Sequence, residues 1–119
     1  MLCSGVFQPG MGMRVNIERA LERMVQSIVR RFAPERIILF GSHATGSAGA
    51  DSDVDLLVVM TPRRSKAAQE IDILKALRRY RMPKDVIVTT PADFAWRKRI
   101  PGTIERPAAL EGRLLYERR

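Results

Sequence analysis

Two aspartates separated by one residue, Asp53 and Asp55, are the residues whose type and spacing point most directly to chemistry. They begin a segment that continues as Leu-Leu-Val-Val-Met, which is typical of a buried strand. Side chains at i and i+2 of a strand point to one face, about 6.6 Å apart along the strand. Carboxylates this close repel each other unless a cation lies between them, and Mg²⁺ prefers oxygen ligands. The alternative is a solvated strand end, or carboxylates paired with nearby arginines.

Gly41 and Ser42 follow the segment Arg-Ile-Ile-Leu-Phe, and ten residues separate them from Asp53. A glycine after a buried strand lets the backbone turn sharply and approach a phosphate, and a serine offers a hydroxyl and an N–H to phosphate oxygens. An ordinary turn at a strand end has the same residues. The functional interpretation therefore rests on the combination with the aspartates.

Asp85 supplies a third carboxylate at the head of another predicted strand. It can join Asp53 and Asp55 if the two strands are neighbours. Three carboxylates around one or two cations can align an attacking oxygen, a phosphorus atom and a pyrophosphate leaving group. The alternative is that Asp85 is an ordinary surface acid after Lys84.

The hydrophobic pattern predicts the elements that must position these residues, as a small α/β (α+β) domain with helices packed on a mixed sheet. Asn16 is the expected start of the first helix, which Pro34 closes, and Ser65 is the expected cap of the second long helix, which Pro83 ends. We expect a flexible leader over 1–13 and one domain over 14–119. The predicted strands are 36–40, 53–60, 85–90 and 113–117, the predicted short helices are 91–97 and 103–111, the latter interrupted near Pro107, and 43–52 is a loop or short helix.

The length and composition fit one folded domain, because 119 residues with 45% hydrophobic and 29% charged residues lie in the ordinary globular range. No apolar stretch is long enough to span a membrane, and the N-terminus is a poor signal peptide, so we expect a cytoplasmic protein. Cys3 is the single cysteine, which excludes an internal disulfide. One histidine and one cysteine cannot build a usual zinc site, so any metal must be held by oxygen.

The formal net charge of +8 raises the possibility of nucleic-acid binding. The basic residues are spread along the chain, however, and aromatic residues that could stack on bases make up only 6%. The sequence therefore favours solvated basic surfaces over direct nucleic-acid binding. Positive charge can also attract a triphosphate, or an acidic patch on a partner.

The segment Gly41-Ser42-His43-Ala44-Thr45-Gly46, followed by Asp51-Ser52-Asp53-Val54-Asp55, resembles the signature of the DNA polymerase β-like nucleotidyltransferases, specifically the minimal nucleotidyltransferase branch. The resemblance extends through Asp85-Val86-Ile87-Val88 to the C-terminal segment. It implies the nucleotidyltransferase fold.

The resemblance also implies a role for each matching residue. Gly41 and Ser42 would hold the β- and γ-phosphates of ATP, and Asp53 and Asp55 would bind two Mg²⁺ ions. Asp85 would complete the metal site and help deprotonate the acceptor hydroxyl.

As a minimal nucleotidyltransferase of this size, the chain resembles the antitoxin of a toxin–antitoxin pair whose toxin is a HEPN-domain RNase. The resemblance implies transfer of AMP from ATP to a tyrosine of that toxin. A chain this short lacks an added domain to hold a small acceptor, which favours a protein acceptor. Two alternatives stay open at this point: a non-catalytic antitoxin that acts by occlusion, and transfer to a small molecule.

Overall fold

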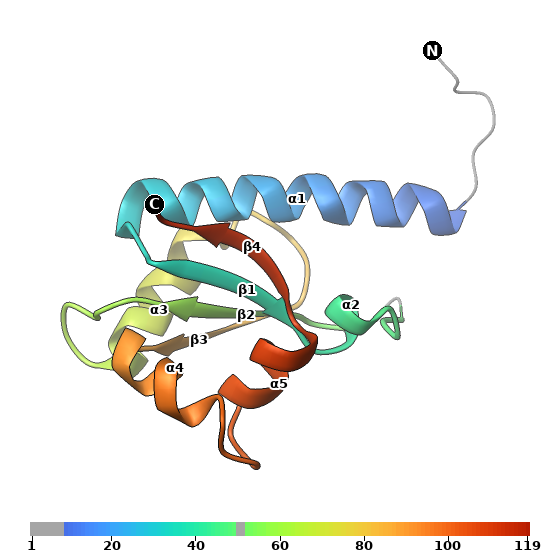
Figure 1. The fold of residues 1–119 in the computed structure, drawn as a ribbon. Helices are drawn as coiled ribbons and strands as arrows, with labels where there is room; N and C mark the ends of the chain where they lie inside the picture. Colours follow the sequence, from blue (N-terminus) through green and yellow to red (C-terminus); the bar gives the residue numbers. More distant parts are fainter. Residues whose placement is uncertain (1–8, 50–51) are drawn as a thin grey trace.

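The computed structural model describes residues 9–49 and 52–119, which form one mixed sheet covered by helices on both faces (Figure 1). This confirms the predicted α/β class. The elements in chain order are α1 (Pro9–Phe32), β1 (Arg36–Phe40), α2 (Ser42–Thr45), β2 (Val54–Val59), α3 (Lys66–Ala76), β3 (Lys84–Thr89), α4 (Pro91–Arg97), α5 (Glu105–Glu111) and β4 (Arg113–Glu117).

The sheet has the strand order β3-β2-β1-β4. The central strand β1 is antiparallel to both β2 and β4, whereas β2 and β3 run parallel. The parallel pair is joined through α3, as a parallel connection requires. Because β2 and β3 are parallel, both begin at the same end of the sheet, and that end also receives the last residue of β1, since Phe40 pairs with Asp55.

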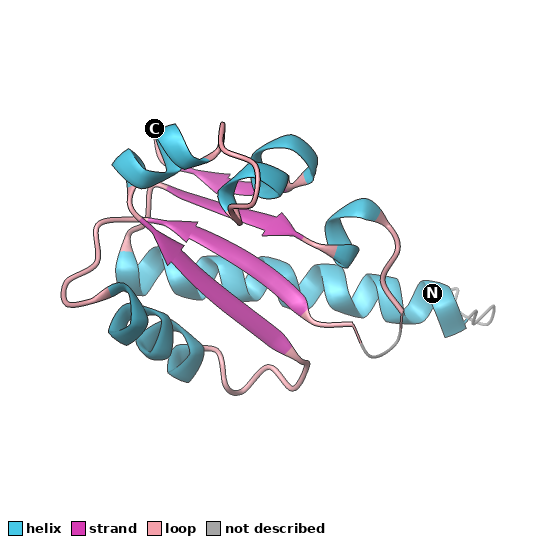
Figure 2. Ribbon diagram, turned by 90° about the horizontal axis from the view of Figure 1, so that it is seen from below, coloured by secondary structure: helices cyan, strands magenta, loops and turns pink. Residues whose placement is uncertain are grey.

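The strand residues alternate between two hydrophobic layers. Leu56, Val58 and Val86 pack with α1 and α3 in the larger layer, while Leu57 and Val59 pack with α4 and α5 in the smaller one. Figure 2 shows the helices on the two sides of the strands. The aspartates of β2 and β3 share the face of Leu57, because residues two apart in a strand point the same way.

The first helix differs from its prediction at the N-terminal end. It begins at Pro9, so Asn16 is not its cap, and residues 9–13, which we expected in the leader, are helical. Proline suits the first position of a helix, and the apolar periodicity that marks a buried face begins only further along, where the helix reaches the sheet. Residues 1–8 lie outside the described part of the chain, and the domain boundary at residue 14 stays a prediction.

The other helix ends follow the expected chemistry in part. The Ser65 side chain accepts a hydrogen bond from the Ala68 N–H, and α4 has its proline in the first turn, as predicted. However, α3 ends at Ala76 rather than continuing to Pro83. Pro107 does not interrupt the last helix, because it is the third residue of α5, where the N–H has no partner inside the helix.

Candidate active site

Asp55 and Asp85 lie side by side on the two parallel strands. They are paired in the β2–β3 register, so both side chains point to the face that α4 and α5 cover. Asp55 is half-buried and Asp85 is exposed. The sequence prediction that neighbouring strands bring these two carboxylates together is therefore met.

Asp53 immediately precedes β2 instead of forming its first residue, as the predicted strand 53–60 had it. The side chain of Asp53 is exposed, and the residue after it, Val54, is fully buried in the larger hydrophobic layer. The burial of Val54 fixes the backbone between the two aspartates, so Asp53 and Asp55 stay at the same end of the sheet.

The electrostatics of Asp55 reflect its neighbours. Its pKa is raised above the ordinary value of 3.8, first by burial and then by the negative charges of Asp85 and Asp53, while His43 opposes the rise. The carboxylates of Asp85 and Asp53 are therefore close enough to Asp55 to disfavour its ionised form. A cation placed among them would relieve the repulsion that raises the pKa.

Gly41 lies against the Asp55 carboxylate at the end of β1. Its φ of 77° is in the region that favours glycine. A Cβ atom at this position would lie 2.5 Å from Asp55 Oδ2, so any side chain here would displace the carboxylate. The glycine is therefore required both for the turn and for the close approach of the turn to the acidic group.

The turn leads into the short helix α2, which begins at Ser42. The N–H groups of Ala44 and Thr45 donate to the Gly41 carbonyl and close this turn. Ser42 is half-buried at the first position of α2, directly after the glycine that lies against Asp55. His43 Nε2 lies 3.1 Å from the Ser52 carbonyl oxygen, which ties the turn to the segment that carries Asp53.

Whether the site fits a divalent cation depends on its donors and on their convergence. The donors are carboxylate oxygens on adjacent strands, which is the chemistry that Mg²⁺ prefers. In the described part of the chain, however, no three His, Cys, Asp or Glu side chains converge closely enough to hold a metal ion. The donor set fits, and its side chains must turn toward one another to share an ion.

A polar network that sequence reasoning missed supports this face from the opposite strand end. The Thr89 hydroxyl donates to buried Glu105 over 2.8 Å, and Arg97 Nε donates to the other carboxylate oxygen over 3.2 Å. Burial alone would raise the pKa of Glu105, but these hydrogen bonds outweigh it and hold the pKa below 4.5. Nothing in the local sequence marks Glu105 as buried, because its partners come from β3 and α4.

Comparison with known proteins identifies the family. The model of the nucleotidyltransferase domain family matches residues 21–111, which include β1, the glycine turn and all three aspartates. The chain therefore belongs to this family and is an enzyme of the nucleotidyltransferase class. Enzymes of the family use a nucleoside triphosphate and a divalent metal.

Individual relatives agree with this assignment. A candidate protein adenylyltransferase from Methanocaldococcus jannaschii is 31% identical over 105 residues, covering 86% of this chain and all of the relative. The crystal structure of a candidate nucleotidyltransferase from Sulfolobus solfataricus has a TM-score of 0.66 at 18% identity, covering 98% of this chain and 94% of that one. A crystal structure of a toxin–antitoxin with AMP-PNP has a TM-score of 0.50 at 20% identity, covering 82% and 74% of the two chains. The two structures establish the fold.

Proposed function

We propose that this nucleotidyltransferase transfers AMP from ATP to a hydroxyl group of a partner protein, most simply a tyrosine, and that the transfer depends on Mg²⁺. The observation that carries the proposal is the pairing of Asp55 with Asp85 beside the Gly41 turn. The relationship to a candidate protein adenylyltransferase supports a protein acceptor.

In this mechanism the nucleotide lies across the end of the sheet where β2 and β3 begin. The Gly41 turn and Ser42 bind the β- and γ-phosphates through the serine hydroxyl and backbone N–H groups. Asp53, Asp55 and Asp85 would hold two Mg²⁺ ions, which supply positive charge to the phosphates and to the leaving group. None of these roles needs a residue from another domain.

The transfer forms a bond between the acceptor oxygen and the α-phosphorus and breaks the bond from the α-phosphorus to the bridging oxygen. Pyrophosphate leaves with the bond electrons. Asp85 is exposed, so an acceptor hydroxyl can approach it and give up its proton to the carboxylate. Asp55 is half-buried against the glycine turn and is better placed to orient the nucleotide than to receive the acceptor.

We further propose that the partner is a HEPN-domain toxin, that the chain acts as its antitoxin by adenylylation, and that the reaction takes place in the cytoplasm. The likeness in fold to a toxin–antitoxin structure supports this context. None of the described helices has the length and hydrophobicity to cross a membrane.

The test is to incubate the purified protein with ATP, Mg²⁺ and the protein encoded by the adjacent gene, and to weigh that protein by mass spectrometry. We expect one or more adenylyl groups on it, and none with the double variant Asp53→Asn/Asp55→Asn or with EDTA. Asp72→Asn is the matched control, because Asp72 lies on α3 in an exposed ion pair with Arg64. An unchanged mass with a partner shown to bind would refute protein adenylylation. Full protection of cells by the double variant would favour occlusion instead.

A further inference from the structure

Most of the exposed large hydrophobic side chains of the described residues fall within one stretch of the chain, residues 96–114. Of the six large hydrophobic side chains that are exposed in the described residues, one, Ile71, lies on α3. The other five lie between α4 and β4, and they are Trp96, Ile100, Ile104, Leu110 and Leu114. We call these five residues the α4–α5 apolar surface. Exposed apolar patches of this kind mark interaction sites more often than scattered residues do.

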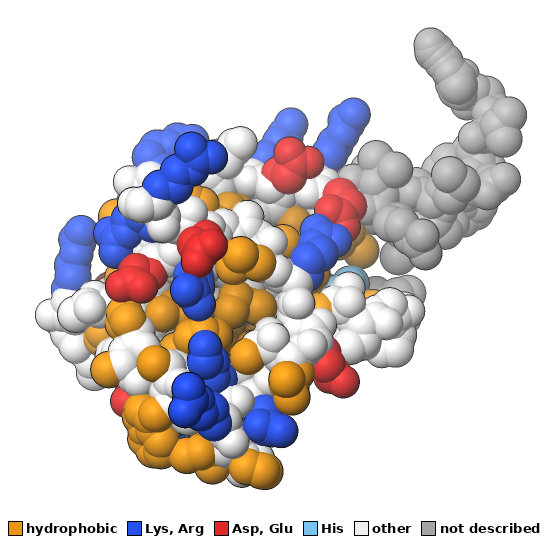
Figure 3. Space-filling view, viewed as in Figure 1, with side chains coloured by type: hydrophobic (Ala, Val, Ile, Leu, Met, Phe, Trp, Pro, Cys, Tyr) orange, Lys and Arg blue, Asp and Glu red, His pale blue; other side chains and the backbone are white. Residues whose placement is uncertain are grey.

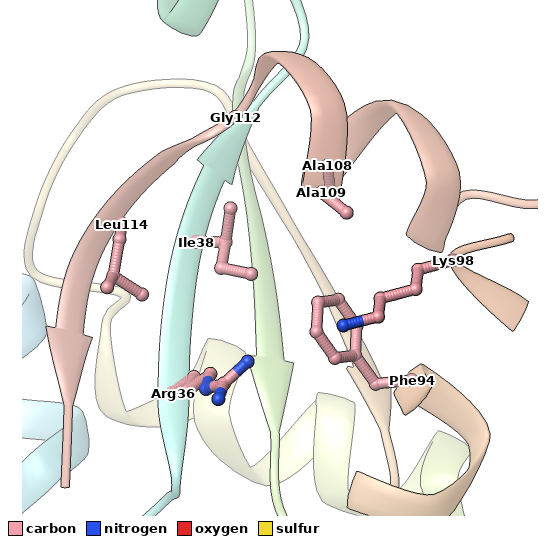
Figure 4. Close-up of a pocket in the computed structure, with 8 residues that line it drawn as sticks. All are labelled: Arg36, Ile38, Phe94, Lys98, Ala108, Ala109, Gly112 and Leu114. Carbon is pink, nitrogen blue, oxygen red and sulfur yellow. The ribbon is translucent and has the colours of Figure 1, made fainter. Parts of the chain in front are cut away.

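A groove next to this surface separates α4 and α5 from the edge of the sheet (Figure 4). Its volume is about 190 Å³, and its walls include Ile38 of β1, Phe94 of α4, Ala109 of α5 and Leu114 of β4. Pockets for small molecules have volumes of roughly 300–1,000 Å³. The groove is therefore better suited to one or two anchoring side chains from a protein than to a free ligand.

The groove is bordered by positive charge. Arg36 and Lys98 lie on either side of the groove against the Phe94 ring, at 5.8 and 5.4 Å from its centre. Arg36 is paired with Glu117 over 3.1 Å. Lys98 forms no ion pair with any described residue.

The unpaired charges of the surrounding segment are mainly positive. The acidic groups Asp93 and Glu105 are already paired, with Lys66 and Arg97. Among the described residues of α4, α5 and their connection, four charged side chains form no ion pair. Three are basic and one is acidic, namely Lys98, Arg99, Arg106 and Glu111. Figure 3 shows basic side chains among the hydrophobic ones on this side of the molecule.

The groove lies on the same face of the sheet as the candidate active site. Ile38 on the groove floor pairs with Leu57, and the next pair on the same face is Phe40 with Asp55. Two residues along a strand span about 6.6 Å. A protein bound in the groove would therefore lie on the side of the sheet from which Asp55 and Asp85 are reached.

A strand from the partner is a poor fit to this site. The edge strand β4 contains a bulge where its pairing with β1 shifts between Ile37 and Ile38. Bulges of this kind twist an edge strand and hinder its pairing with further strands. The open space lies instead between helices and the sheet face, where a helix can pack through its side chains.

We propose that the groove and the α4–α5 apolar surface dock an acidic amphipathic helix of a partner protein. Apolar residues of that helix would enter the groove between Phe94 and Leu114, and its carboxylates would face Lys98 at the border of the groove. If the proposed function is right, this partner is the protein that receives AMP, and only that part of the inference rests on the proposed function. Docking of the helix needs neither nucleotide nor catalysis.

The probe is a synthetic acidic peptide, held helical by a staple on its polar face, with Leu at positions i, i+3, i+4 and i+7 and Glu elsewhere. Trp96 is the single tryptophan and is half exposed on α4, so its fluorescence is one readout of binding, alongside the anisotropy of a labelled peptide. We expect a saturable blue shift with a Kd below about 1 mM. A peptide of the same composition without the helical spacing should give no saturation.

Matched variants locate the binding. Leu110→Ser and Leu114→Ser should each weaken binding about tenfold, and Lys98→Glu should weaken it and reduce its dependence on salt. Ile71→Ser and Lys75→Glu are the controls, because they make equivalent apolar-to-polar and charge-reversing changes at exposed positions on α3 and should bind as the unaltered protein does. Unchanged folding is checked by circular dichroism.

Four outcomes would overturn the docking proposal: no saturation at millimolar peptide, equal binding of the scrambled peptide, equal weakening by the α3 controls, or a Trp96 shift with anionic vesicles or an oligonucleotide but not with the peptide. A failure of AMP transfer leaves this binding result unchanged. Conversely, a failure of peptide binding leaves the adenylylation assay unaffected, so the two proposals can be refuted separately.

Discussion

The two faces of the sheet differ in what their residues do. The face toward α1 and α3 is covered by a continuous apolar layer in which Met24, Ile28 and Ile73 have no exposed surface. The face toward α4 and α5 has a smaller core around Leu57 and leaves room for the aspartates and the groove. Strand alternation thus separates the residues that stabilise the domain from those available to a nucleotide or a partner.

The difference teaches that stability and chemistry can be changed independently in this small domain. Residues adjacent in sequence, such as Val54 and Asp55, belong to different faces and have different environments. Substitutions on the α1 and α3 face should change the free energy of unfolding, and substitutions at the aspartates should change activity. The following predictions test this separation, beginning with the largest expected effect.

Asp55→Asn should lower adenylyl transfer by at least about 100-fold, because it removes a charged ligand at the reacting end of the sheet. The same variant should be at least as stable as the unaltered protein in metal-free buffer at pH 7. The raised pKa means that the folded state binds the proton more tightly than the unfolded state, so the ionised carboxylate costs stability above that pKa. Thermal unfolding in EDTA checks the sign, and a clear loss of stability would contradict it.

Ile28→Ala should lower stability and leave the activity of each folded molecule unchanged, the reverse of Asp55→Asn. Ile28 lies on α1 and is fully buried in the larger hydrophobic layer, so its truncation should lower the free energy of unfolding by about 2–5 kcal/mol. The rate per folded molecule should stay the same, because no contact to the acidic end of the sheet is lost. Urea unfolding and an active-fraction assay separate the two quantities, and a lower rate per folded molecule would break the comparison.

Gly41→Ala should lower both stability and activity. Alanine at a φ of 77° costs about 1–3 kcal/mol, and its Cβ would displace the Asp55 carboxylate. Gly46→Ala is the matched control, because Gly46 has a φ of 83° but open space around it. We expect both variants to unfold at lower temperature and only Gly41→Ala to lose activity. Equal activity of the two variants would contradict the contact.

Glu105→Gln should lower stability by about 1–3 kcal/mol at pH 7, because Thr89 and Arg97 then lose a charged acceptor. The folded-state pKa is below the ordinary 4.5, so this stabilisation is present above that value and is lost as the pH falls through the folded-state pKa. The difference between variant and unaltered protein should therefore shrink in acid. Unfolding curves measured from pH 7 to pH 3 test it.

Glu18→Gln should have the smallest effect. Glu18 accepts two hydrogen bonds from Arg113, at 2.8 and 3.0 Å, which join α1 to β4. Both side chains are nearly half exposed, so the pair is worth about 0.2–1 kcal/mol and weakens with salt. A loss of stability larger than that caused by Glu105→Gln would contradict this prediction. It would show that the ion pair between α1 and β4 stabilises the fold more than its exposure implies.

The sequence alone was enough to predict the acidic end of the sheet and most of its supporting elements. The apolar strands, the proline at the start of α4 and the Ser65 cap are local signals, and the structure has each of them. The start of α1 could not be predicted, because residues before the buried face have no apolar period to mark the helix. The roles of the three aspartates, of Gly41 and of Ser42 stay predictions until the assays are made.

Tertiary structure decided what local patterns cannot encode. Only the parallel pairing of β2 and β3 places Asp85 beside Asp55, because a carboxylate thirty positions away leaves no trace in the spacing of the first pair. The groove likewise depends on α4, α5 and β4 packing around Ile38, and its charged border joins Arg36 to Lys98 across the fold. Residue types and short spacings specify which groups are available, whereas strand order and packing determine which of them meet.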